Sequence, residues 1–345
     1  MRELSPGCPD NLVCISTSLR FVLLFGTQPG KFVFWTLSKN KVALGVVSII
    51  VCEVLFGFSF LFTKTATASV SALTLLSWRF MAAFVVMSLC ALAGIIKLDF
   101  RKKSVSPLVL VAFFHPVLYF AGETAGIRLT TASESGTIIA CIPVVAILMS
   151  ILILKEPPTR LQLAGVAVSI AGVIVIVLVK GAEAAFSTLG YVLLLSAVFS
   201  YGLFSVFSQK ASRFSSAEKT YVMVALGALV FTAAALVENA RGGTMSQFVS
   251  LPVHNTDFLY AVLYLGVGCS VFAFFLNNVS IANIGTNRTA TFAGLTTVVA
   301  VLAGVLILGE QFSVLQGLGA AMVLGGVYLA NITARARAVV MESEA

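Results

Sequence analysis

Long apolar runs separated by short polar breaks dominate the pattern of this chain. The runs are about 20 residues long and do not alternate between hydrophobic and polar positions, so they predict helices rather than strands. At about 1.5 Å per residue, each run can cross about 30 Å of hydrocarbon. Breaking the chain at charged residues, prolines and glycines gives ten candidate spans, at 42–63, 72–95, 106–127, 133–154, 160–180, 188–208, 218–237, 258–280, 287–308 and 314–333.

Composition points to lipid as the main solvent of these helices. Hydrophobic residues make up 59% of the chain and charged residues 10%, whereas soluble domains carry about 25% charged residues. With a cytoplasmic N-terminus, 17 of the 22 Lys and Arg residues fall on the cytoplasmic side and four outside. This asymmetry predicts a multi-pass protein of the cytoplasmic membrane with both termini cytoplasmic. It also explains the net charge of +8 without nucleic acid as a partner.

The two ends of the chain are expected to lie outside the bundle. Pro29, Gly30 and Lys31 interrupt the apolar patches of residues 1–38, so this part is predicted to be a poorly ordered or interfacial tail. It lacks the pattern of a signal peptide, which is a short apolar stretch followed by small residues at a cleavage site. Residues 334–345 are expected to form a cytoplasmic tail.

One passage of the chain is written twice. LILKEPPTRLQLAGVAVSIAGV at 152–173 recurs 154 residues later as LILGEQFSVLQGLGAAMVLGGV at 306–327, with ten of 22 positions identical. Apolar helices resemble each other by chance, so polar and glycine matches carry the weight of the comparison. These matches are Glu156/Glu310, Gln162/Gln316, Gly165/Gly319 and Gly172/Gly326. The sequence therefore predicts an internal duplication, with one five-helix repeat at 42–180 and a second at 188–333.

The number of spans in each repeat predicts their relative orientation. Five is odd, so the second copy must enter the membrane from the opposite side. Such an inverted repeat is typical of transporters whose binding site lies near mid-membrane between the halves. The alternative is a duplicated bundle that does not transport, such as a scaffold or a sensor. An enzyme is not expected, because the chain has no GxSxG, HExxH or Walker sequence, and no cofactor is expected.

The repeated passage itself is best interpreted as structural. Thr159 with Gln162, and Ser313 with Gln316, have the spacing of a capping box and would start the fifth and tenth helices. Glycines seven residues apart would then give each helix a small face for close packing. Glu156 and Glu310 are expected to be turn residues at the membrane boundary.

Several quoted motifs resemble the drug/metabolite transporter superfamily, specifically its EamA-domain members. FGFSFLFTK at 56–64 is similar to that family's first-helix signature, with Phe56 where Trp is usual, and Arg79 in LSWRFMAA matches an Arg of its second helix. IPVVAILMSILILKEPPTRLQLAGVAVSIAGV at 142–173 resembles its run of Pro, Glu, Gln and Gly. TTVVAVLAGVLILGEQFSVLQGLGAAMVLGGV at 296–327 repeats that run, although Thr297 stands opposite Pro143.

The resemblance covers 42–333 and has consequences for architecture. It implies that helices 1, 3, 4, 6, 8 and 9 surround a transport pathway. It also implies that helices 5 and 10 are peripheral and support a homodimer.

Glu53 lies near the middle of the first span, about 16 Å from either face by helical rise. An ionisable group at that depth is costly, and desolvation disfavours its charged form. Glu53 therefore suits a proton carrier, and the alternative is a structural carboxyl group.

A second polar group is expected on the third span. His115, Tyr119 and Glu123 are spaced i, i+4 and i+8, so a regular helix would place them on one stripe. The position aligned with Glu123 in the second half is Asn277, next to Asn278, and the two halves would then offer a carboxylate and amides to one cavity. The stripe could instead consist of hydrogen bonds between helices.

Three more polar residues complete the candidate site. Arg79 is predicted to form a structural or gating ion pair with Glu53 or Glu123. Tyr201 and Ser205 share a face of the sixth span and are candidates for lining the pocket, or for helix packing.

These residues favour a secondary transporter that exports a small metabolite or drug by alternating access in exchange for protons. The alternatives are a pH-independent facilitator or exchanger of amino-acid-like or nucleobase-like solutes, and a non-transporting scaffold or sensor. The expected partners are a small-molecule substrate, protons, the lipid bilayer and a second copy of the chain. The residues predicted to bind substrate or protons are Glu53, Glu123, Asn277, Tyr119, His115, Asn278, Tyr201 and Ser205.

Overall fold

The computed structural model describes residues 41–100, 105–149, 152–153, 159–181, 187–211, 213–284 and 292–343. Within these ranges every regular element is a helix, which confirms the all-α prediction. The tail predicted at 1–38 lies outside the described residues, as does Glu156.

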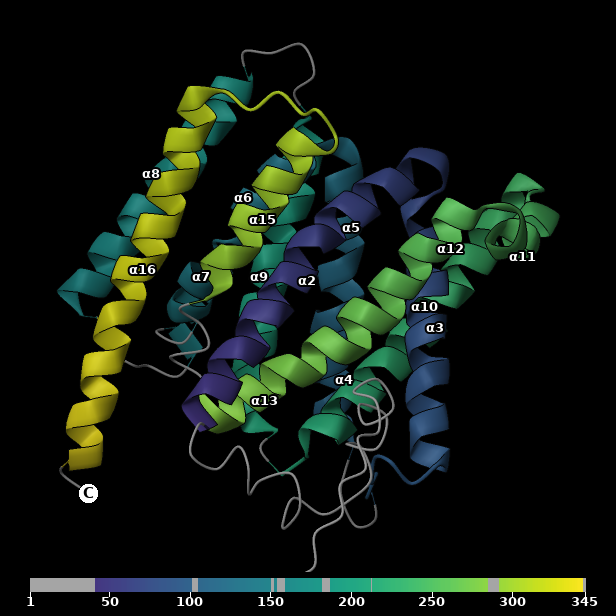
Figure 1. Ribbon diagram of the computed structural model, residues 1–345, viewed down its shortest axis with the longest axis horizontal. Coiled ribbons are helices and arrows are strands. Elements are labelled where there is room, and N and C mark those ends of the chain that lie inside the picture. The colour runs from purple at the N-terminus through teal and green to yellow at the C-terminus, as the bar shows by residue number, and fades with distance from the viewer. Residues whose placement is uncertain are drawn as a thin grey trace, which may run out of the picture.

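The first half of the chain contributes the helices before residue 182, coloured purple to teal in Figure 1. They are α2 (Lys41–Ser69), α3 (Ala72–Leu92), α4 (Ser106–Ala112), η3 (Phe113–Leu118), α5 (Tyr119–Leu129), α6 (Ala132–Ile139), α7 (Ile142–Met149) and α8 (Arg160–Gly181). The second half contributes α9 (Thr188–Lys210), α10 (Ser216–Gly242), α11 (Met245–His254), α12 (Thr256–Leu263), η5 (Tyr264–Ala273), α13 (Phe274–Ile284), α15 (Ala293–Leu306) and α16 (Val314–Ser343).

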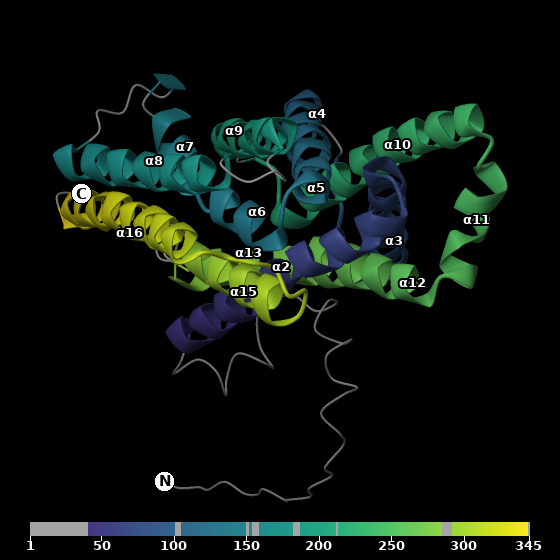
Figure 2. The same ribbon diagram turned by 90° about the horizontal axis from the view of Figure 1, so that it is seen from above.

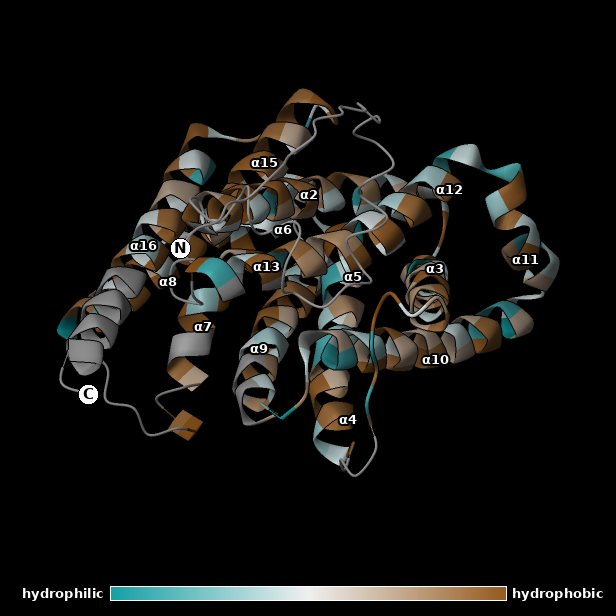
Figure 3. Cartoon of the chain, turned by 60° about the horizontal axis from the view of Figure 1, so that its bottom comes forward, coloured by the Kyte–Doolittle hydropathy of each residue, from teal (hydrophilic) through white to brown (hydrophobic). Residues whose placement is uncertain are grey.

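Hydrophobic residues predominate along these helices (Figure 3), and many of their side chains are exposed, as expected for a protein in lipid. Leu178 on α8 and Leu229 on α10 are 69% and 68% exposed. Six helical segments are long and apolar enough to cross a membrane, and four shorter apolar helices accompany them. Exposed apolar surface on this scale marks contact with a membrane, and the chain is a multi-pass membrane protein.

Two of the predicted spans are interrupted by prolines. The span at 106–127 contains the π-helical segment η3, where His115 has φ −142° and ψ 110° and Pro116 follows it. The span at 133–154 is divided at Ala140 and Cys141, just before Pro143, so the prediction of one continuous helix is wrong there. Proline lacks an N–H group, so in both spans a carbonyl of the preceding turn loses its helical partner. Proline also disfavours a helical conformation in the residue before it, as His115 shows.

The sequence reasoning also missed α11 and η5. Helix α11 links α10 to α12 at one edge of the bundle, away from α8 and α16 (Figures 1 and 2). Its more polar sequence gave no span signal. The segment η5 contains no proline, and within it Ser270 Oγ donates to the Leu265 carbonyl oxygen, five residues back, at 3.0 Å.

Helices α8 and α16 lie side by side at the other edge of the bundle (Figures 1 and 2). The repeated glycines make this contact. A Cβ atom on Gly172 would lie 2.6 Å from the carbonyl oxygen of Gly319, and Gly326 faces the carbonyl oxygen of Gly165 in the same way. The lower residue number meets the higher one, so the two helices are antiparallel. The predicted small faces are confirmed.

The predicted capping boxes of α8 and α16 are also confirmed. The backbone N–H of Gln162 donates to Thr159 Oγ1 at 3.2 Å, and the backbone N–H of Thr159 donates to Gln162 Oε1 at 2.9 Å. Ser313 and Gln316 repeat this reciprocal pair with distances of 3.2 and 2.8 Å. Each box satisfies N–H groups that the first turn of a helix leaves without intrahelical partners.

Two further pairs of helices from different halves are antiparallel. In the pair α3 and α10, Ser71 contacts Glu238 at 2.6 Å and Ser77 contacts Thr232 at 3.2 Å. In the pair α6 and α15, Ser133 Oγ donates to the carbonyl oxygen of Val301 at 3.5 Å and Thr297 Oγ1 donates to that of Gly136 at 3.0 Å. The centre of the bundle lies between these pairs, where α2 packs against α13, α15 and η5, and α9 packs against α5, α7 and η3.

Candidate functional site

Glu123 and Tyr119 form a buried hydrogen-bonded pair on α5. Tyr119 Oη donates to Glu123 Oε1 at 2.8 Å, one helical turn apart. Both side chains are 6% exposed. This part of the predicted stripe is present because α5 is a regular helix from Tyr119 onward.

His115 lies among aromatic rings rather than in helical register with this pair. Its backbone is non-helical, yet its ring centroid is 4.8 Å from that of Tyr119. The other rings around it, at centroid distances of 4.8 to 5.7 Å, are those of Phe120, Tyr201, Phe204 and Phe274. His115 is 2% exposed, and its Nδ1 atom has no hydrogen-bond partner among the described residues.

Arg79 of α3 is held in place by a serine and a phenylalanine. Its Nε atom donates to Ser270 Oγ at 3.2 Å, and its guanidinium carbon lies 4.1 Å from the centroid of the Phe120 ring. Arg79 is 2% exposed, and its charge interacts with that of Glu123. The described contacts do not include a direct ion pair between Arg79 and Glu53 or Glu123, so the ion pair stays a prediction.

Glu53 lies on α2, where this helix packs against α15. Thr296 Oγ1 donates to the carboxylate of Glu53 and, at 3.1 Å, to its carbonyl oxygen. The ring centroid of Tyr201 on α9 is 5.3 Å from that of His115 and 5.6 Å from that of Tyr119.

Of the other three predicted residues, the structure describes the side chain of Asn277. Asn277 lies on α13 beside Cys52, and so near Glu53, and its side chain is partly buried. No described contact joins Asn277 to Glu123. That the two residues line one cavity stays a prediction. The side chains of Asn278 and Ser205 lie outside the described part of the structure.

Sequence reasoning missed several aromatic and polar members of the site, Phe204 among them. Ser270, Thr296, Phe120 and Phe274 bind or surround the predicted residues. Phe120 and Phe274 are 154 residues apart, the offset of the repeat. A search for aromatic residues matched at that offset could have found this pair, whereas nothing in the sequence singled out Ser270 or Thr296.

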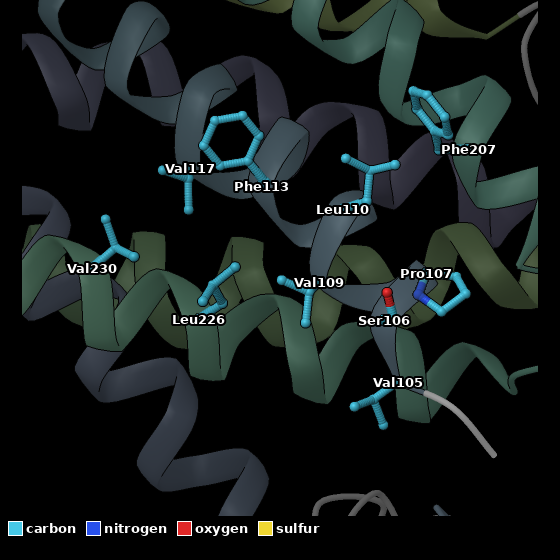
Figure 4. A pocket seen from close by; sticks show the side chains of 10 residues that line it. All are labelled: Val105, Ser106, Pro107, Val109, Leu110, Phe113, Val117, Phe207, Leu226 and Val230. Carbon is cyan, nitrogen blue, oxygen red and sulfur yellow. The ribbon is translucent and has the colours of Figure 1, made fainter.

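A separate groove opens on the flank of the bundle between α4, η3 and α10 (Figure 4). Its volume is about 1250 Å³. Apart from one serine its lining is apolar, and it includes none of the predicted site residues: Val105, Ser106, Pro107, Val109, Leu110, Phe113, Val117, Phe207, Leu226 and Val230. Phe207, which lines this groove, stacks on Phe114 with the ring centroids 5.4 Å apart.

The arrangement defines a class of protein. Two carboxyl groups, a guanidinium and an imidazole in the interior of an apolar helical bundle are costly, and such groups in membrane proteins mark pathways for substrates and ions. The profile of the EamA-like transporter family matches residues 43–178 and again 188–332. The chain belongs to this family and is a membrane transporter, which confirms the resemblance seen in the sequence.

Individual relatives agree with this membership. The chain is 32% identical to the uncharacterized transporter YcxC of Bacillus subtilis (strain 168) over 296 residues, 85% of this chain and 95% of the relative. It is 28% identical to a probable amino-acid metabolite efflux pump of Escherichia coli (strain K12) over 174 residues, 49% of this chain and 56% of that protein.

A solved crystal structure, described only as that of a protein, has a similar fold. It matches with a TM-score of 0.53 and 18% sequence identity over 86% of this chain and 97% of the other. At this identity the likeness concerns the fold alone.

Proposed function

We propose that this protein is a secondary transporter that exports a small metabolite or drug by alternating access, in exchange for protons. Ten spans in two inverted halves carry the movement, both termini are cytoplasmic, and Glu53 and Glu123 carry the proton. The observation that carries this proposal is the presence of two hydrogen-bonded carboxyl groups on different helices inside the bundle: Glu123 accepts a bond from Tyr119, and Glu53 accepts one from Thr296.

The packing of the halves supports the inverted repeat. Two pairs of helices that correspond in the repeat, α3 with α10 and α8 with α16, are antiparallel. Ser169 Oγ donates to the carbonyl oxygen of Val323 at 3.2 Å, and these residues are separated by 154 positions. Equivalent helices that run in opposite directions are what two five-helix units of opposite orientation would produce.

The polar groups of the site have unused bonding capacity, which supports binding of a substrate. His115 Nδ1 is buried without a partner among the described residues. Among the described contacts, Arg79 donates one hydrogen bond, from Nε to Ser270 Oγ, and its guanidinium carries four further N–H donors. Buried polar groups are normally hydrogen-bonded, and exceptions call for an unseen partner such as water or a ligand.

Proton exchange follows from the position of the two carboxyl groups. A carboxyl group that loses its charge on protonation is cheaper to keep in an apolar interior. Binding and release of a proton at Glu53 or Glu123 would therefore change the relative stability of the two orientations of the transporter. Export is supported by the relative that is named a probable amino-acid metabolite efflux pump.

The test is flux in proteoliposomes with an imposed pH gradient. Amino acids, nucleobases and cationic drugs are screened first, and the flux of the best substrate is then measured for Glu53→Gln and Glu123→Gln. We expect the gradient-driven flux of at least one of these variants to be about tenfold or more below that of the native protein, because the neutral amide cannot carry the proton. The matched control is Glu238→Gln, which removes an exposed carboxylate that accepts a hydrogen bond from Ser71.

The outcomes separate the alternatives. Equal flux in both variants and in the control would refute proton coupling through these residues. Flux of equal size with and without a pH gradient would favour a facilitator or exchanger. Absence of flux for every substrate class would favour a scaffold or sensor.

A further inference from the structure

Glu310 connects the two halves of the chain at one end of the bundle, where α5 stops and α6 starts. It lies in the turn between α15 and α16, which agrees with its prediction as a turn residue. Its carboxylate accepts hydrogen bonds from the backbone N–H groups of Ala132 and Ser133 at 2.7 and 3.0 Å, and from Ser133 Oγ at 2.7 Å. A side chain of the second half therefore caps a helix of the first half.

A second hydrogen bond between the two halves lies next to this cap. Gln316 Nε2 donates to Glu134 Oε1 at 3.2 Å. Glu134 belongs to the capping box of α6 and Gln316 to that of α16. The two side chains are 1% and 0% exposed. The starts of two helices from different halves are thus tied directly to each other.

Lys64 of α2 binds the C-terminal end of α5 at the same end of the bundle. Its Nζ atom donates to the carbonyl oxygens of Ile127 and Arg128, both at 3.1 Å, and of Thr130. These groups end α5, and a cation is favourable at a helix C-terminus. The charge of Lys64 also interacts with those of Glu310 and Glu134.

The fit around Glu310 depends on a glycine. A Cβ atom on Gly304 would collide with Ser133 Oγ and with the carboxylate of Glu310. One turn away, a Cβ atom on Gly136 would lie 2.6 Å from the Cβ of Ala300. The close approach of α6 and α15 is therefore required for the contact that Glu310 makes.

We propose that Glu310, with the N–H groups of Ala132 and Ser133 and the Ser133 hydroxyl, is a latch that holds this end of the bundle shut. The inference rests on the proposed function, because alternating access requires each end to open in turn. Hydrogen bonds suit such a latch because water can replace them when the end opens. The charge of Glu310 strengthens them, since a charged acceptor makes bonds about twice as strong as a neutral one.

The latch is tested by a distance across it. Spin labels are placed at Arg128→Cys on the first half and Gln311→Cys on the second, two exposed positions, in a variant whose six native cysteines are replaced. Distances are measured by electron–electron double resonance in lipid nanodiscs. We expect a mainly short distance in the otherwise native protein, and Glu310→Gln to raise the ratio of long to short distances by about tenfold or more.

Two further variants sharpen the test. Ser133→Ala removes one of three donors and should shift the ratio the same way by about threefold to tenfold, which preserves the test if Glu310→Gln does not fold. Glu238→Gln removes an exposed carboxylate that also joins helices of the two halves, and should leave the distances unchanged. Distances in Glu310→Gln and Ser133→Ala that equal those of this control would overturn the proposal.

Flux is measured on the same variants in proteoliposomes. We expect Glu310→Gln to slow transport. Alternating access requires this end to close before the other end opens, and the variant would close it less often. Shifted distances with unchanged flux would overturn a role for the latch in transport. The distance measurement needs no substrate, so absence of flux in the native protein would refute the proposed function without affecting the test of the closed end.

Discussion

The contact between α8 and α16 gives the sharpest prediction about stability. In Gly172→Ala the new Cβ atom would lie 2.6 Å from the Gly319 carbonyl oxygen and 2.8 Å from the Val323 backbone nitrogen. Both are backbone atoms, so relief requires the helices to move apart. Overpacking of this kind costs about 1–3 kcal/mol.

A matched glycine on the same pair of helices isolates this cost. Gly325 has no atom within 4 Å of the position that a Cβ would take. Both substitutions remove a glycine from a helix interior, which alone gains up to about 1 kcal/mol. The difference in unfolding free energy between Gly172→Ala and Gly325→Ala should therefore be about 1–3 kcal/mol, with Gly172→Ala the less stable.

The assay is reversible unfolding in mixed micelles, with the denaturing detergent titrated and helix content followed by circular dichroism. Gly326→Ala should behave like Gly172→Ala, because its Cβ would lie 2.6 Å from the Ser169 backbone nitrogen. Equal unfolding free energies for Gly172→Ala and Gly325→Ala would refute the reasoning, since the predicted overlap would then have no energetic effect.

Two other substitutions test contacts described above. Arg79→Lys should lower the unfolding free energy by about 2 kcal/mol, because an ammonium group replaces the planar guanidinium over Phe120 and its Nε donor to Ser270; unchanged detergent unfolding would contradict this. Ser169→Ala should lower the unfolding free energy by about 0.6 kcal/mol, the average for such hydrogen bonds between membrane helices. Its effect and that of Gly325→Ala should add in the double variant, because a Cβ atom on Gly325 contacts no other residue.

The parts of the fold that the sequence predicted are those with a local signal. Hydropathy located the long helices, and the spacing of Thr159 to Gln162 located the start of α8. Helix α11 was missed because a short amphipathic segment resembles a polar loop. The break at Pro143 was passed over because the apolar run continues through it, and hydropathy does not detect a missing N–H group.

The site was predictable as a set of unusual residues, and its geometry was not. Glu53 and Glu123 were found because carboxyl groups are rare in apolar runs. Ser270 and Thr296 are ordinary residues of membrane helices, and only the packing of η5 and α15 gives them their partners. The stripe from His115 to Glu123 assumed a regular helix, and η3 changes the direction of His115.

The glycine contacts between α8 and α16 restrict how this protein can change its sequence. In a core made by side chains, a larger residue on one helix can be accommodated by a smaller one opposite. Gly172 meets the backbone of Gly319, and Gly326 meets the backbone of Gly165. No substitution can shrink a carbonyl group, so compensating pairs of mutations are unavailable at these positions. A pairwise mutational scan should find them intolerant singly and in combination, while Gly325 beside them tolerates exchange.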